Sequence, residues 1–149
     1  MGLPSAFVEP LQVVSYIQGQ HFDLHHDAGT LDDENKSVEL VHPRRLVTLF
    51  VYLNTLPLNE GHTEFPYLNI SVRPERGAAI LFCNLLPSGE ADFRTSHLAR
   101  SITRPDMRKL GLNIWIGDTS FQSLAGGEEN AQRSRKRRKE TTKNEDVIR

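Results

Sequence analysis

Short apolar runs separated by turn residues make up most of this chain, and this pattern limits the folds it can adopt. The longest run, residues 46–53, reads Leu-Val-Thr-Leu-Phe-Val-Tyr-Leu. It predicts a central strand, because β-branched and aromatic side chains favour extended backbone. Proline and glycine interrupt the chain between runs, and no segment shows the periodicity of an amphipathic helix. The sequence therefore predicts an all-β sandwich or barrel with little helix.

The same pattern predicts how the chain is divided. Further strands are expected at residues 11–16, 21–27, 63–65, 70–72, 78–82, 96–103 and 109–116. Residues 28–44 are polar and acidic, so we expect a long loop there. The hydrophobic pattern stops after Phe121. We therefore expect one folded domain over residues 1–121 and a disordered basic tail over residues 122–149.

Composition bears on the cellular setting. No apolar run approaches the roughly 20 residues of a membrane span, so we expect no membrane association. The N-terminus lacks the basic and apolar regions of a signal peptide. The single cysteine, Cys83, excludes an internal disulfide and is expected to be buried within its apolar run. Together these features favour a reducing intracellular compartment, the nucleus or the cytoplasm.

The C-terminal tail is basic although the whole chain carries a net charge of −1. From Glu128 onward there are eight basic and five acidic residues, so the rest of the chain is acidic. The run at residues 133–139, Arg-Ser-Arg-Lys-Arg-Arg-Lys, predicts either a nuclear localisation signal or a solvated tail without a role. Specific binding to nucleic acid is the least favoured of the interpretations.

One short motif, His25-His26-Asp27, indicates metal chemistry. In a strand, His25 and Asp27 would point to the same face and His26 to the other. Two such ligands and a further histidine form the facial triad of non-haem Fe(II) oxygenases. His97 is the best candidate for the third ligand, since it stands at the mouth of a predicted strand far along the chain. Taken alone, a histidine is more often a surface or core residue than a ligand.

A cation is expected to face the same place. Period-two alternation puts four residues on one strand face: Lys109, Gly111, Asn113 and Trp115. An inward Lys109 would need an anion such as a dicarboxylate, because a buried unpaired ammonium is costly. The alternative is a solvent-exposed face with an ordinary lysine. Tyr52, in the central strand, offers a phenol for a carboxylate, or it packs in the core.

Taken in order, these motifs resemble the prolyl 4-hydroxylase branch of the Fe(II)- and 2-oxoglutarate-dependent dioxygenases. The resemblance runs from about Leu11 to Asp118, and the ordered set is specific although each motif is weak. Its main motifs are G-Q-H-F-D-L-H-H-D at 19–27, R-L-V-T and Y-L-N within 45–54, T-E-F-P at 63–66, V-R-P at 72–74 and K-L-G-L-N-I-W at 109–115.

The resemblance implies a double-stranded β-helix, or jelly roll, and a set of site residues. By the family pattern, His25, Asp27 and His97 would bind Fe(II). The same pattern implies that Lys109 and Tyr52 bind 2-oxoglutarate. Thr63 and Trp115 would line the pocket. The implied co-substrates are 2-oxoglutarate and O₂, with ascorbate as a further requirement.

The implied reaction is hydroxylation of a substrate C–H bond, with peptidyl proline in a peptide or protein favoured and succinate and CO₂ released. One alternative is the same chemistry on a non-prolyl substrate, and another is a catalytically inactive jelly-roll interaction module. The segment before Lys109 is longer than the family pattern, which leaves Arg108 as an alternative cation. Only 24 residues precede His25, so we expect either truncation of the N-terminal support region or self-association.

Overall fold

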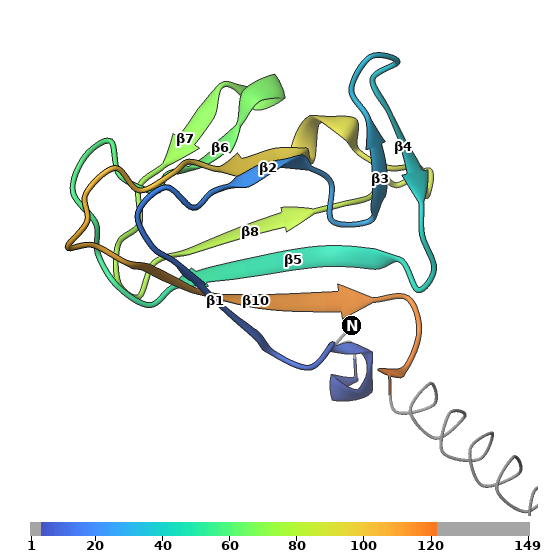
Figure 1. Cartoon of the computed structure of the whole chain (residues 1–149). Coiled ribbons are helices and arrows are strands. Elements are labelled where there is room, and N and C mark those ends of the chain that lie inside the picture. Colours follow the sequence, from blue (N-terminus) through green and yellow to red (C-terminus); the bar gives the residue numbers. More distant parts are fainter. Residues whose placement is uncertain (1–3, 122–149) are drawn as a thin grey trace, which may run out of the picture.

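A computed structural model of the chain describes residues 4–121 (Figure 1). Within them, two four-stranded antiparallel sheets face each other, and a separate two-stranded hairpin stands at one end. In chain order the elements are η1 (Ser5–Phe7), β1 (Gln12–Tyr16), β2 (Phe22–His25), β3 (Gly29–Asp32), β4 (Ser37–Leu40), β5 (Arg45–Tyr52), β6 (Thr63–Phe65), η2 (Pro66–Leu68), β7 (Ile70–Val72), β8 (Ala79–Cys83), η3 (Phe93–Thr95), β9 (His97–Ala99) and β10 (Lys109–Gly117).

The strand order brings distant parts of the chain together. The major sheet has the order β1-β10-β5-β8 and the minor sheet the order β2-β9-β6-β7. Strands β1 and β2 are neighbours in sequence, yet each pairs with a late strand in a different sheet. This is the jelly-roll arrangement, and the predicted all-β fold is confirmed.

The two faces of the major sheet differ. In an antiparallel pair, directly opposed residues point to the same side of the sheet. Trp115 on β10 opposes Thr48 on β5, and Lys109 opposes Tyr16 on β1, so this face points toward the minor sheet. The alternation predicted for residues 109–115 is therefore present, with its polar face inward.

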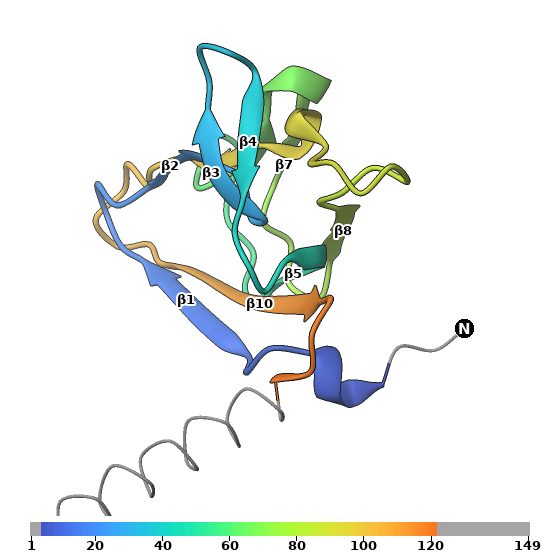
Figure 2. The same cartoon turned by 90° about the vertical axis from the view of Figure 1, so that its right-hand side faces the viewer.

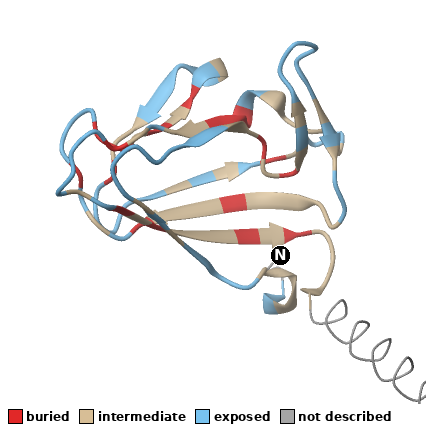
Figure 3. Cartoon of the chain, in the orientation of Figure 1, coloured by how far each residue is buried: buried red, intermediate tan, exposed pale blue. Residues whose placement is uncertain are grey.

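The outer face of the major sheet is apolar. Leu112 opposes Val51 across the centre of the sheet, and the edge residues Val13 and Leu81 are 66% and 68% exposed. Figure 3 shows buried positions on β5 and β10, at the start of β9, in the loop after β2 and in the loops at the opposite end of the sheets. The expected self-association stays a prediction.

The prediction of a long loop over residues 28–44 is wrong. This segment forms the β3–β4 hairpin, in which Leu31 opposes Val38, and the hairpin projects beyond the minor sheet (Figure 2). Gly29 permits the close pairing, because a Cβ there would overlap the carbonyl of Glu39. In the sequence, the hairpin is indicated only by two short stretches in which apolar and polar residues alternate. The charged residues around these stretches made a loop the simpler interpretation.

Two smaller expectations are also wrong. Cys83 is exposed, because it lies on the outer face of β8 opposite Val47, while Phe82 points inward. The strand expected at residues 96–103 ends at Ala99, since Ile102 forms only an isolated bridge to Gln18. Period-two patterns indicate which residues share a face, but they do not indicate whether that face is covered.

Some expectations fall outside the described residues. The basic run at residues 133–139 and the proposed tail are among them. Within residues 4–121, no helix has the length and apolar character needed to cross a bilayer.

Candidate metal centre and adjoining pocket

Three potential metal ligands meet between the ends of β2 and β9. His25 ends β2 and opposes His97, which begins β9, so their rings lie 4.3 Å apart. The Oδ1 atom of Asp27 lies 3.5 Å from His25 Nε2 and 3.9 Å from His97 Nε2. The three ligand atoms all lie within 4.8 Å of one another, which is close enough to bind a single ion.

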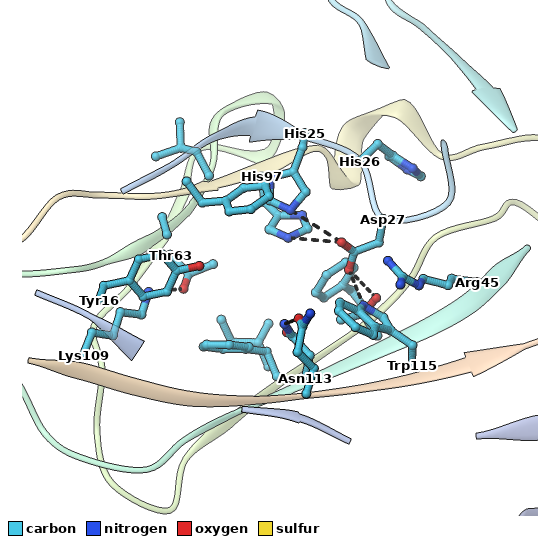
Figure 4. A pocket seen from close by; sticks show the side chains of 18 residues that line it. Tyr16, His25, His26, Asp27, Arg45, Thr63, His97, Lys109, Asn113 and Trp115 are labelled. Atoms are coloured by element: carbon cyan, nitrogen blue, oxygen red, sulfur yellow. Dashed lines mark hydrogen bonds and ion pairs between the residues drawn. The ribbon is translucent and has the colours of Figure 1, made fainter. Parts of the chain in front are cut away.

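Asp27 reaches this cluster from a turn. Strand β2 ends at His25, and the chain reverses over Asp27 and Ala28 before β3. The expectation that a strand continues to Asp27 is therefore wrong, although the two side chains do converge. His26 points away from the cluster (Figure 4).

Hydrogen bonds fix the orientation of the Asp27 carboxylate. Its Oδ2 atom accepts from Thr48 Oγ1 at 2.6 Å and from Trp115 Nε1 at 3.1 Å. Burial raises the pKa of the Asp27 carboxyl, but the two histidines beside it and the hydrogen bonds from Thr48 and Trp115 lower this pKa further than burial raises it. The group is therefore an anion at neutral pH, with Oδ1 directed to the histidines.

Both histidines of the cluster are held through their second ring nitrogen. His25 Nδ1 lies 2.8 Å from the carbonyl of Asp23, and His97 Nδ1 lies 3.0 Å from the carbonyl of Thr95. A carbonyl can only accept, so Nδ1 carries the proton and Nε2 presents a lone pair to the centre. Burial lowers the pKa of His97 to about 4, which keeps it neutral and able to bind a metal.

His26 connects the loops that carry the cluster. Its Nδ1 accepts from the N–H of Ala28 at 3.2 Å, and its Nε2 lies 3.2 Å from the carbonyl of Asp92 and from Thr95 Oγ1. The side chain is buried, and burial lowers its pKa. His26 therefore ties the Asp27 turn to the segment that precedes His97.

A cavity of about 270 Å³ adjoins the cluster. Lys109 lies at one end of it with only 1% of its surface exposed, and Arg108 is exposed (Figure 4). The Lys109 ammonium lies 5.5 to 5.8 Å from the ring centres of Tyr16, Phe50 and Tyr52.

The polar surroundings of Lys109 lack an anion. Its ammonium donates a hydrogen bond to Thr63 Oγ1 at 3.3 Å, and no carboxylate among residues 4–121 forms an ion pair with it. Burial lowers the pKa of Lys109 to about 8. A cation in this environment favours binding of an anion.

Tyr52 stands behind Thr63. It has no exposed surface, its hydroxyl donates to Thr63 Oγ1 at 2.8 Å, and burial raises its pKa to about 12. Thr63 thus accepts from both Tyr52 and Lys109, so its own hydroxyl hydrogen can donate into the cavity. Thr63 and Trp115 line the cavity as expected, and Tyr16 is a lining residue that the sequence analysis missed.

Arg45 lines the other end of the cavity and was also missed. Its guanidinium stacks 3.6 Å above the ring of Trp115 and forms two hydrogen bonds with Glu9, of 2.7 and 3.0 Å. Alternation along β5 does not predict this position, because a register shift between Ile116 and Gly117 pairs Gly117 with Arg45. The available signal was the R-L-V-T motif, which begins at Arg45 and to which the sequence analysis assigned no site role.

Gly111 shapes the cavity floor. A Cβ on Gly111 would overlap the ring of Phe50, which lies directly against the β10 backbone. The ring therefore packs edge-on to Tyr52, with ring centres 5.1 Å apart, and leaves the space beside Lys109 open.

The donor set fits a divalent transition metal. Two imidazole nitrogens and one carboxylate oxygen form a group that can fill one side of a coordination sphere. A buried cation with no carboxylate partner among residues 4–121 shares the cavity. These two features fit a metal ion and a carboxylate ligand bound side by side.

Comparisons with known proteins agree with this geometry. Residues 11–117 match the family model described as the 2OG-Fe(II) oxygenase superfamily. Over 98 residues, 66% of this chain, it is 37% identical to prolyl 4-hydroxylase subunit alpha-1 of Gallus gallus, of which the match covers 19%. It is 30% identical over 122 residues to a putative prolyl 4-hydroxylase of Acanthamoeba polyphaga mimivirus, covering 80% of this chain and 49% of that protein.

A solved structure is also similar. The viral collagen prolyl hydroxylase of Paramecium Bursaria Chlorella virus-1, in its 2OG complex, superposes with a TM-score of 0.64 and 29% identity. The match covers 75% of this chain and 60% of that one. The chain thus spans about a fifth of the chicken relative and about half of the mimivirus protein.

Proposed function

The chain belongs to the 2OG-Fe(II) oxygenase superfamily, and from that premise we propose that it is a dioxygenase that hydroxylates peptidyl proline. In this reaction the substrate C–H becomes C–OH, with one oxygen atom from O₂. The second oxygen atom of O₂ enters succinate as 2-oxoglutarate is converted to succinate and CO₂. The observation that carries the proposal is the His25, Asp27 and His97 cluster, which shares its cavity with the unpaired ammonium of Lys109.

The proposal gives each group a role. His25, Asp27 and His97 would bind Fe(II), and Lys109 would pair with the distal carboxylate of 2-oxoglutarate. The Thr63 hydroxyl would donate a hydrogen bond to the same carboxylate. Tyr52 would orient this hydroxyl through its own 2.8 Å hydrogen bond to Thr63 Oγ1. Trp115 and Thr48 hold Asp27 in place. When bound, iron and 2-oxoglutarate would supply the chemistry by which O₂ oxidises the C–H bond.

The hairpin next to the metal cluster supports a chain-like substrate. The β3–β4 hairpin begins directly after the metal-binding turn, and its tip is held by Lys36, which packs over the rings of Tyr67 and Phe93. Tyr67 also donates a hydrogen bond to Asp33 at the same tip. A hairpin braced in this way can form one wall of a groove and exclude water from the reacting centre.

Proline is the favoured target within such a chain. Proline-containing segments already prefer an extended conformation, which lowers the entropy cost of binding in a groove. The relatives compared above are prolyl hydroxylases by name, and they support the same substrate class.

The direct test offers the chain Fe(II), ascorbate, 2-oxoglutarate and a library of proline peptides, with alanine-substituted peptides as matched controls. The expected result is a mass gain of one oxygen on proline together with succinate, both lost in the His97→Ala variant. Succinate without modified proline would indicate a non-prolyl substrate. Absence of both products from a metal-loaded protein would indicate an inactive jelly-roll module.

We further propose that the basic run at residues 133–139 directs the protein to the nucleus. Seven successive positions include six Lys or Arg, which is the composition that import signals use. Replacing these six with glutamine in a fluorescent fusion should move the protein to the cytoplasm without changing its activity. Unchanged nuclear localisation of the glutamine variant would rule the run out as the signal.

A further inference from the structure

Asn84 occupies a fixed position one step away from the metal cluster. It follows β8 and is 0% exposed. Its backbone N–H donates to the carbonyl of Leu46 on β5, and its carbonyl accepts from the N–H of Asp92 before η3, both at 2.9 Å. These bonds hold the Asn84 side chain between the major sheet and the segment that leads to His97.

The side chain of Asn84 extends a hydrogen-bond relay to Asp27. Asn84 Nδ2 lies 3.0 Å from Thr48 Oγ1, which lies 2.6 Å from Asp27 Oδ2. The direction of the relay follows from chemistry, because an ionised carboxylate can only accept and Thr48 has one hydroxyl hydrogen. Thr48 must therefore donate to Asp27, and Asn84 must donate to Thr48.

The other end of the amide has no partner. Asn84 Oδ1 is the single buried side-chain polar atom among residues 4–121 without a hydrogen bond. An unpaired buried oxygen is unfavourable for folding, and such atoms in native structures call for an explanation. The carbonyl oxygen of the amide is thus left without a hydrogen bond, while the NH₂ group donates to Thr48. This indicates that the position requires a hydrogen-bond donor.

We propose that Asn84 is a positioning residue that directs the Thr48 hydroxyl to Asp27 and so selects the carboxylate oxygen that binds the metal. With Thr48 and Trp115 both bonded to Oδ2, only Oδ1 faces His25 and His97. Asp27 would then offer a single oxygen, Oδ1, to a metal held by His25 and His97 at the edge of the cavity. Without the Asn84 donor, the Thr48 hydroxyl is no longer directed to Asp27, and the carboxylate can turn.

The proposal rests on the metal site proposed above, so its test begins with metal binding and needs no turnover. Co(II) is titrated into the natural chain and into Asn84→Leu, which removes the donor and leaves no unpaired oxygen. We expect the affinity for Co(II) to fall about tenfold or more, as for other residues that orient a ligand. The visible absorption spectrum of the bound Co(II) should change as well, since it reports ligand geometry.

Three further variants separate positioning from a loss of folding. Thr48→Val breaks the relay at its other link and should give the same altered spectrum. The double variant should show no additional loss of affinity, because both changes act through one bond to Asp27. Asn54→Ala is the matched control: its amide bonds the backbone of Arg108 and Leu110, away from the cluster, and should leave Co(II) binding unchanged.

The outcomes are distinct. A folded Asn84→Leu variant with unchanged affinity and spectrum, or additive losses in the double variant, would overturn the positioning role alone. Failure of the natural chain to bind Co(II) would overturn the metal site itself, and the positioning role with it.

Discussion

Lys109 Nζ lies 3.3 Å from Thr63 Oγ1, in a bond between strands of different sheets whose residues are 46 positions apart. The bond fixes a buried ammonium at the end of the cavity, with aromatic rings around it and no carboxylate partner among residues 4–121. A buried cation of this kind is costly until an anion binds, so the site favours an anion, in agreement with the proposed binding of 2-oxoglutarate.

Replacing Lys109 should therefore weaken co-substrate binding selectively. A charge-assisted bond contributes about 1.5–3 kcal/mol, so Lys109→Ala should raise the KM for 2-oxoglutarate roughly tenfold to a hundredfold. Metal affinity, measured by titration, should change little. Arg108→Ala is the matched control, because Arg108 is exposed. A defect confined to Arg108→Ala would transfer the role to that residue.

The same buried lysine should make stability depend on pH. Its pKa is lowered from 10.5 in the unfolded chain to about 8 in the folded one. Between these values the unfolded chain binds more protons, so raising the pH across this window favours folding. The destabilising contribution of Lys109 is therefore full below about pH 8 and disappears by about pH 10.5, a change of at most about 3 kcal/mol.

Urea unfolding of the natural chain and of Lys109→Met isolates this effect, since other titrating groups are common to both. The Met variant should be the more stable below pH 8, and its advantage should shrink as the pH rises. An advantage that stays constant across the window would mean that Lys109 titrates normally. Adding 2-oxoglutarate should stabilise the natural chain and not the variant.

The three clustered side chains should all be needed for metal binding. His25→Ala and His97→Ala each remove one of three protein ligands and should abolish turnover, with Fe(II) binding weakened by at least about tenfold. Asp27→Glu should also fail, because one added methylene moves the carboxylate by about 1 Å. His21→Ala is a suitable control, since His21 is exposed outside the cluster. Normal activity in a folded His25 or His97 variant would remove that residue from the ligand set.

Shortening the β3–β4 hairpin should separate substrate binding from co-substrate chemistry. Replacing residues 30–39 with a short glycine linker keeps the turn that carries Asp27 and removes most of the hairpin that follows it. Peptide hydroxylation should fall by at least about tenfold, while 2-oxoglutarate turnover without peptide should change by less than about threefold, because closure over substrate acts mainly on the coupled reaction. Equal losses of both activities, measured as modified peptide and as succinate, would contradict this role. Lys36→Ala offers a milder version, since it removes the contacts of Lys36 with Tyr67, Phe93 and Asp33 but keeps the hairpin and the bond from Tyr67 to Asp33.

Local sequence patterns were sufficient to predict part of the fold and part of the candidate site. Alternation along residues 109–115 predicted that Lys109 and Trp115 share a face, and the β-branched run at 46–53 predicted the central strand that carries Thr48 and Tyr52. Both succeed because the two-residue repeat of a strand is a property of the backbone itself.

Other features depended on contacts between distant segments. The sequence did not show that the outer face of β8 stays uncovered and exposes Cys83, nor that a register shift turns Arg45 into the cavity. The hairpin at residues 29–40 was hidden by its charged side chains, and its pairing is set by the close approach at Gly29.

The sequence by itself determined which side chains are available and which of them share a strand face. Only the tertiary structure decided which of those faces meet. Asp27 reaches His97 because a turn follows β2 and because β2 pairs with β9, and Asn84 reaches Asp27 only through Thr48 on another strand. Pairings between residues so far apart in the chain are selected by the packing of the two sheets as a whole, and no local repeat in the sequence encodes them.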